Sequence, residues 1–347
     1  MASRPRLKPY FRPLRRGPDT VQLGVSHEAG GIVVSGLGPA DLALLEQLDG
    51  TFSEHQVRYA VAARCGVAPE RAAEILDLLR EHRMLAVDSV DRVDLGRLRT
   101  SMRDGLRQDA EVLALLGGTD DPMSGIVARH HRSVVVSGTG RLPWSIAALL
   151  RSGGVGQVHL GQWALDAAEQ ELRDEVSQPP PDLVVLVAEG AVDPRQGEPW
   201  RRRSVPQLPV VSDGRRIVVG PLVGHLPGLP CLRCLEMSRA DRDAAWPVVM
   251  AQLAPRMPGA SEIPSESTMV AIAAGVVGMV THAFLAGTPT PAGVSVEVTL
   301  PWPRLDHRRW HRHPRCETHA PDPTEPPEIV VGSPRARPAD PRVTMTG

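Results

Sequence analysis

Two cysteines separated by two residues are the side chains of this sequence best suited to chemistry. Cys231 and Cys234 form a C-x-x-C motif that follows a turn rich in glycine and proline, and the chain of 347 residues has 4 cysteines in all. Such a pair is typical of a zinc knuckle, because thiolates are strong ligands of Zn²⁺. A thioredoxin-type redox pair would open a helix within a different βαβ pattern. The motif therefore predicts half of a metal site.

The other half is expected in the segment HRHPRCETHA, residues 311–320. It contains a C-x-x-H motif, and structural zinc has four protein ligands. We predict a Cys3His zinc site made of Cys231, Cys234, Cys316 and His319, with His313 and His311 as alternative fourth ligands. Four protein ligands leave no open position, so this metal would be structural. The alternative is that the cysteines pack separately and the histidines lie on a solvated loop.

A glycine turn is the second candidate site. Gly138 and Gly140 lie between an apolar strand and an apolar helix, like the phosphate-binding turn of a dinucleotide-binding βαβ unit. Pro143 stands where a third glycine would complete that motif, and Gln162 stands where an acidic residue would hold a ribose. Glu189, at the end of a later strand, is the remaining candidate for a magnesium-binding carboxylate, although a solvated surface glutamate is the simpler interpretation. The pattern therefore favours a Rossmann-like turn without a ligand over a nucleotide-binding site.

The elements that must position these residues form two predicted domains. Residues 18–90 contain two short strands, three amphipathic segments and a closing strand, which indicates a winged-helix-like α+β domain with Cys65 as a small buried residue. Residues 131–320 open with a βαβ unit and continue with apolar strands, which indicates a Rossmann-like α/β domain. The remaining segments are predicted to be a basic tail, a helical connector and a disordered proline-rich tail, at 1–17, 91–130 and 321–347.

Composition excludes several classes of protein. The net charge is -1, so no overall field attracts nucleic acid or a membrane surface. The first residues lack the apolar core of a signal peptide, and the few cysteines do not suit a disulfide scaffold, so we expect a cytoplasmic protein. Residues 269–287 are the most apolar run, but they are rich in alanine and glycine and include Thr281 and His282. We predict a buried core helix there and no membrane span.

Taken together, these segments resemble the ThiF/MoeB/HesA adenylating family, which has a ubiquitin-activating-like fold. The most specific match is PCLRCLEMSRADRDAAWP at 230–247, supported by GTGRLPWSIAALLRSGGVGQVHL at 138–160. The chain looks in particular like the ThiF-like leader-peptide-binding proteins of ribosomal peptide pathways, which work beside a YcaO cyclodehydratase. The resemblance implies structural zinc, a homodimer, a winged-helix domain that binds a precursor peptide, and a modifying enzyme as partner.

Departures from the family pattern weaken the enzymatic interpretation. Pro143 and Gln162 depart from the family's nucleotide site. Thioester chemistry would also need a free thiol, and Cys65 is the one cysteine outside the predicted zinc site. We therefore expect no catalytic residue and weak ATP and magnesium binding at most, and we favour a degenerate scaffold that presents a precursor peptide. An ATP-dependent adenylyltransferase acting on a carboxylate is the alternative. A DNA-binding winged helix is a weaker third hypothesis, since the segment 70–84 mixes acids with its arginines.

Overall fold

The computed structural model divides the chain into two compact units. The first comprises Met1–Val127 and Val330–Gly347, and the second comprises Ala128–Ile329. The described residues are 4–25, 30–86, 104–116, 123–161, 170, 179–253, 265–302, 304–319 and 342–344.

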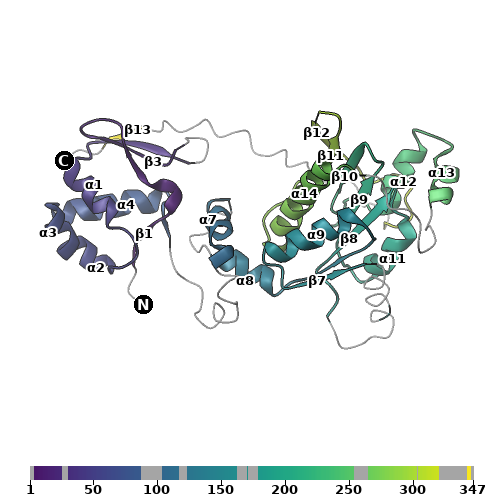
Figure 1. Cartoon of the computed structure of the whole chain (residues 1–347), viewed down its shortest axis with the longest axis horizontal. Helices are drawn as coiled ribbons and strands as arrows, with labels where there is room; N and C mark the ends of the chain where they lie inside the picture. The colour runs from purple at the N-terminus through teal and green to yellow at the C-terminus, as the bar shows by residue number, and fades with distance from the viewer. Residues whose placement is uncertain are drawn as a thin grey trace. The chain divides into compact units, whose positions relative to one another are not determined.

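The first unit combines small sheets with short helices (Figure 1). Its strands are β1 (Arg6–Leu7), β2 (Pro13–Arg15), β3 (Thr20–Leu23), β4 (Ile32–Ser35) and β5 (Leu85–Ala86). Its helices are α1 (Pro39–Glu46), α2 (Glu54–Gln56), a π-helical turn (Val57–Val61), α3 (Ala62–Cys65), α4 (Pro69–Glu81) and α7 (Arg107–Leu116). Those that lie between residues 18 and 90 match the strands and helices predicted there. The name winged helix stays a prediction.

The pattern of apolar residues explains this unit. Helix α4 starts with a proline at its first turn and buries Ala72, Ile75, Leu76 and Leu79, which recur every three or four residues. Strand β4 alternates between buried and half-buried residues, so Ile32 and Val34 join the same core. Cys65, predicted to be buried, is half-buried and packs against the edge of this core.

The first residues are not a tail, which corrects the prediction for 1–17. Strand β1 pairs with β5, Phe11 is buried, and β2 pairs with β3. Lys8 is 3% exposed and its Nζ donates a hydrogen bond to the carbonyl of Arg83 at 2.8 Å. Arg6 forms an ion pair with Glu111 at 2.9 Å. Lys8 and Arg6 therefore make contacts within the folded unit.

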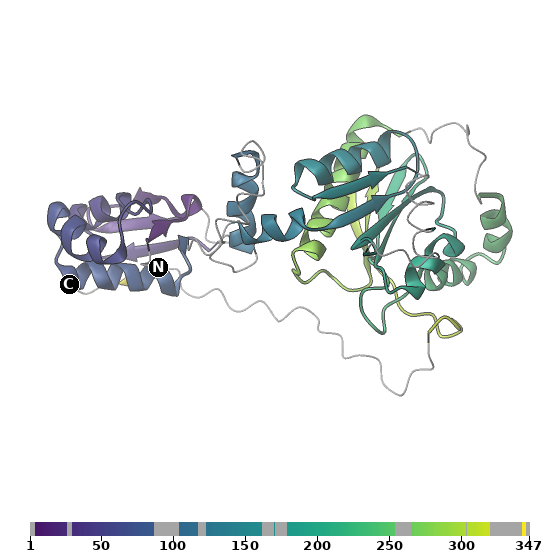
Figure 2. The same ribbon diagram turned by 90° about the horizontal axis from the view of Figure 1, so that it is seen from below.

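The second unit has a seven-stranded sheet in the order β12-β11-β10-β9-β8-β6-β7 (Figure 2). Strands β6 (Ser133–Val136), β7 (Gln157–Leu160), β8 (Leu183–Glu189) and β9 (Gln207–Ser212) are parallel. Strands β10 (Arg216–Val219), β11 (Val294–Thr299) and β12 (Arg304–Arg309) extend the sheet in antiparallel fashion. The βαβ opening is confirmed, with α9 (Arg141–Ser152) between β6 and β7. Strand β12 was not predicted from the sequence.

Helices cover both faces of this sheet (Figure 1). Alternate residues of β8 belong to two cores: Leu183 and Val185 pack toward α9 and α14 (Ser267–Leu285). Val184 and Leu186 pack on the other side, with Trp200 of α11 (Pro194–Arg202) and Leu232 of α12 (Leu232–Ala240). A shorter helix, α13 (Trp246–Leu253), follows α12, and α8 (Ser124–His130) precedes β6. This arrangement is the predicted Rossmann-like α/β domain.

Helix α14 is long and apolar enough to cross a bilayer by length and composition alone. However, half of its most apolar window is buried inside the unit, and Met269, Val270, Ala273 and Val277 belong to the core beside α9. This burial is what a core helix of the sheet requires, as predicted.

The prediction of a disordered segment at 321–347 needs a correction. Residues Arg342–Thr344 form a strand, β13, which pairs in parallel with β4 of the first unit. The corresponding sheet order is β13-β4-β3-β2. Residues 320–341, Gln162 and the segment 87–103 lie outside the described residues, so the predictions for them remain open.

Candidate functional site

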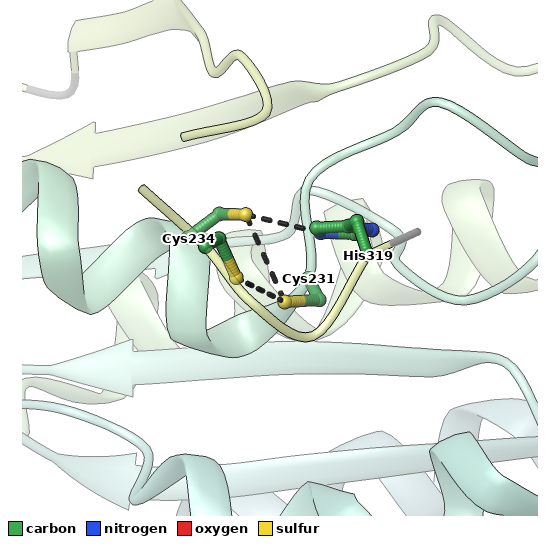
Figure 3. A group of neighbouring side chains, drawn as sticks. Cys231, Cys234 and His319 are labelled. Atoms are coloured by element: carbon green, nitrogen blue, oxygen red, sulfur yellow. Dashed lines mark hydrogen bonds between the residues drawn. The ribbon is translucent and has the colours of Figure 1, made fainter. Parts of the chain in front are cut away.

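The four predicted metal ligands lie together in the second unit (Figure 3). Cys231 caps the N-terminus of α12 and Cys234 lies in its first turn, while Cys316 and His319 follow β12. The Sγ of Cys231 is 3.8 Å from the Sγ atoms of both Cys234 and Cys316. The Sγ of Cys234 is 3.2 Å from the Nε2 of His319.

These distances fit a metal ion with tetrahedral coordination. Zinc–sulfur bonds of about 2.3 Å place two sulfur ligands of a tetrahedron about 3.8 Å apart. All four ligand atoms lie within 4.8 Å of one another. The three cysteines are buried, so the ligands are held by the fold and not by a mobile surface. The cluster could therefore hold a metal such as zinc, with no protein ligand missing.

The cluster also favours thiolate. Hydrogen bonds from Cys234, and the positive charge of His319, lower the pKa of Cys231 to about 4. The hydrogen bond with Cys231, together with burial, raises the pKa of Cys234, because a second thiolate beside the first is unfavourable. A divalent cation removes that repulsion, since it stabilises both thiolates at once.

His313 supports the cluster and is not one of its ligands. Its backbone N–H donates a hydrogen bond to the Sγ of Cys234 at 3.3 Å. Its ring Nε2 lies 2.8 Å from Asp241, and its Nδ1 accepts from the backbone N–H of Arg315 at 3.2 Å. The hydrogen bond from His313, and then the charge of Arg315, lower the pKa of Asp241. Both ring nitrogens of His313 are thus engaged, whereas His311 is exposed.

The glycine turn lies where a doubly wound sheet binds ligands. Strand β6 has β7 on one side and β8 on the other, so the chain changes direction across the sheet at this point. Gly138 and Gly140 have φ of 91° and 99°, in the region that favours glycine. A Cβ on Gly138 would lie 3.2 Å from the carbonyl of Val187 and 3.3 Å from Pro143. The ring of Pro143 therefore packs beside Gly138, where the glycine turn approaches β8.

Glu189 is the last residue of β8. It lies at the carboxyl ends of the parallel strands, as the glycine turn does. The backbone N–H of Val187 donates to the Oγ of Ser137 at 3.1 Å, which ties the two strand ends together. Glu189 is half-buried. The structure thus brings Gly138, Gly140 and Glu189 to the carboxyl ends of neighbouring parallel strands. Gln162 lies outside the described part of the chain.

A cavity in the second unit was not predicted from the sequence. It has a volume of about 300 Å³ and lies beside Gly190, next to the end of β8. Its lining includes two tryptophans and four arginines: Trp246, Trp310, Arg216, Arg239, Arg242 and Arg308. Three of the guanidinium groups lie 5.5–5.6 Å from the ring of Trp310. The arginines come from β10, from the end of α12 and from β12, so no single local motif revealed them.

Carboxylates neutralise this arginine–tryptophan cavity only in part. Glu297 pairs with Arg308 at 2.7 Å and with Arg216 at 3.4 Å, and Glu236 pairs with Arg239. Burial raises the pKa of Glu236 and lowers that of Arg239. Arg216 also pairs with Asp213 at 3.2 Å. Four arginines against these three carboxylates leave an excess of one positive charge, so the cavity suits an anionic group.

The fold is similar to that of several solved structures. A heterocyclase solved in complex with substrate and cofactor has 16% identity and a TM-score of 0.62, over 91% of this chain and 39% of that one. The heterocyclase TruD has 20% identity and a TM-score of 0.60, over 91% and 42%. E. coli MccB has 13% identity and a TM-score of 0.57, over 94% and 98%. The chain shares their fold.

That likeness confirms the predicted resemblance at the level of architecture. It extends over more than nine tenths of this chain, and the chain spans about two fifths of the length of the two heterocyclases. E. coli MccB has also been solved with AMPCPP and MccA, with a TM-score of 0.59 to this chain. No protein-family model and no curated protein sequence matches the chain.

Proposed function

We propose that this chain is a degenerate ThiF-like scaffold that binds a precursor peptide and presents it to a modifying enzyme such as a YcaO cyclodehydratase. The observation that carries the proposal is the edge of the first unit's sheet, where β4 pairs with an extended segment of the chain. An edge that accepts one extended backbone can accept another. The likeness to heterocyclases and to MccB, solved with substrate or with MccA, supports a peptide as the ligand.

In this proposal, backbone hydrogen bonds to β4 give the peptide its affinity. The half-buried Val33 and Ser35 alternate with the core residues Ile32 and Val34, so they offer a surface that distinguishes registers. The ion pair between Arg71 and Asp41, with a further hydrogen bond from Arg71 to the carbonyl of Gly36, holds the end of β4 in place. The strand is therefore a rigid template for an incoming peptide.

We assign the chemical modification of the peptide to a partner enzyme, because the nucleotide site of this chain is incomplete. Phosphate-binding turns present backbone N–H groups to the ligand, and Pro143 supplies none in the first turn of α9. Arg141, the first residue of that helix, donates to the Oγ of Ser267 at 2.7 Å. Three of the four cysteines form the metal cluster, so thioester transfer would depend on Cys65 in the first unit. We propose structural zinc, weak ATP binding at most, a homodimer and a cytoplasmic location.

The test is peptide binding measured beside nucleotide chemistry. The short peptide encoded nearest to this gene should bind the purified chain with saturable affinity, measured by fluorescence anisotropy. Calorimetry with magnesium-ATP should show no saturable binding below millimolar concentration. A chain that binds ATP but no such peptide would contradict the scaffold.

The second candidate is an ATP-dependent adenylyltransferase that activates a peptide carboxylate. The arginine–tryptophan cavity favours it, because its positive charge lies beside Gly190, one residue after Glu189. ATP–pyrophosphate exchange dependent on a peptide, and abolished in Glu189→Ala, would establish this activity in place of the scaffold.

A further inference from the structure

The strand β13 occupies the edge that the proposed peptide would use. Arg342 lies opposite Val33, Val343 opposite Val34, and Thr344 opposite Ser35, in parallel register. On its other side β4 is fully paired with β3. Without β13, the backbone groups on the outer side of β4 would have no strand partner, and such an edge pairs readily with any extended chain.

We propose that the segment Arg342–Thr344 is an internal competitor, which a precursor peptide must displace before the chain can bind it. This inference rests on the proposed function and adds regulation to its binding site. The two strands would form the same backbone hydrogen bonds with β4, so they cannot occupy that edge together.

The size and attachment of β13 suit such a competitor. It has three residues, so it forms few hydrogen bonds and can open at low cost. It is covalently attached to the chain, and such tethering gives an effective local concentration on the order of millimolar. Val343 and Thr344 are β-branched and follow Pro341, a composition that favours an extended strand over a helix. The segment can thus dissociate from β4 at low cost and pair with it again readily.

Competition of this kind has a measurable size. A segment that covers the edge nine tenths of the time leaves one tenth of the molecules competent, which weakens the apparent affinity for a peptide about tenfold. We therefore expect a chain that ends at residue 329 to bind peptide about 3- to 10-fold more tightly than the full chain.

The first experiment uses the segment itself as the probe. A fluorescent synthetic peptide of residues 338–347 should bind the chain that ends at residue 329, and should bind the full chain at least about 3-fold more weakly. A scrambled peptide is the control. Replacement of Arg342, Val343 and Thr344 by glycine in the full chain should restore binding, whereas Ala336→Gly with Ala339→Gly should not.

The second experiment does not depend on any added peptide. Hydrogen exchange of those β4 amides that face away from β3 should accelerate on truncation at residue 329, while the amides of α4 should keep their rates. Unchanged β4 exchange, or equal binding of the probe to the full and truncated chains, would overturn the inference. If β4 exchange rises but the precursor peptide does not bind the truncated chain, the competitor stands and the proposed function fails.

Discussion

Single side chains determine whether the second unit holds its metal. We expect Cys231→Ser to lose zinc and to lower the melting temperature of this unit by at least about 10 °C, since structural zinc contributes several kcal/mol to folding. Metal analysis and thermal unfolding measure the two effects. Cys65→Ser is the matched control, because Cys65 lies in the other unit. Soluble wild-type protein that contains no zinc would contradict the site.

The ring of His313 should matter indirectly, by holding the backbone beside Cys234 in place. We expect His313→Ala to weaken zinc affinity by up to about 10-fold, the lower end of the effect of removing a group that orients a metal ligand. Its backbone N–H to Cys234 would remain, but its ring contacts to Asp241 and Arg315 would be lost. Competition with a chromogenic chelator measures the change. His311→Ala, at an exposed position, should retain wild-type affinity.

A half-buried histidine, His282, gives the second unit a pH dependence. Burial, and then the charge of Arg129, lower the pKa of His282 to about 4 from an ordinary value of 6.5. Between these values the unfolded chain binds the proton and the folded chain does not, so stability falls as pH decreases from 6.5 to 4. The full effect of this group is at most about 3 kcal/mol. Urea unfolding at pH 5 and pH 7.5 should show a smaller acid loss in His282→Gln than in wild type.

At the scale of the elements, the turn after β6 depends on glycine. We expect Gly138→Ala to destabilise the second unit by about 1–3 kcal/mol, because the φ of 91° and the carbonyl of Val187 both disfavour a Cβ. Gly275→Ala is the control, since a Cβ there meets nothing within 4 Å and α14 favours alanine. That variant should be neutral or more stable by up to about 1 kcal/mol in urea unfolding.

The elements also show how far the sequence could be interpreted. Local patterns predicted β6, α9 and α4 because each has a clear period and a proline or glycine at its boundary. Motif spacing predicted the four metal ligands, since thiols and imidazole have few other reasons to occur in such pairs. The arginine–tryptophan cavity was not predictable, because it exists only after β10, α12 and β12 have come together. Strand β13 was missed because three residues among prolines look like disorder.

For the whole molecule, we predict a homodimer formed through the second unit. Trp144 of α9 and Met279 of α14 are 63% and 65% exposed on two helices that pack together. Burial of such side chains is favourable, so Trp144→Glu combined with Met279→Glu should give a monomer in sedimentation. Trp302→Glu, at an 84% exposed turn position, should leave the mass unchanged. A wild-type mass of one chain at micromolar concentration would rule the dimer out.

The separation of the metal ligands along the chain has a consequence for biosynthesis. Cys231 and Cys316 are 85 positions apart, as are Cys234 and His319. During translation, the first two ligands therefore leave the ribosome well before the last two, and a site with two thiolates holds zinc weakly. Helix α14 and strands β11 and β12 are made in that interval. The metal can therefore bind all four ligands only after these elements have emerged. Metal binding thus stabilises this unit late in its folding and cannot initiate that folding.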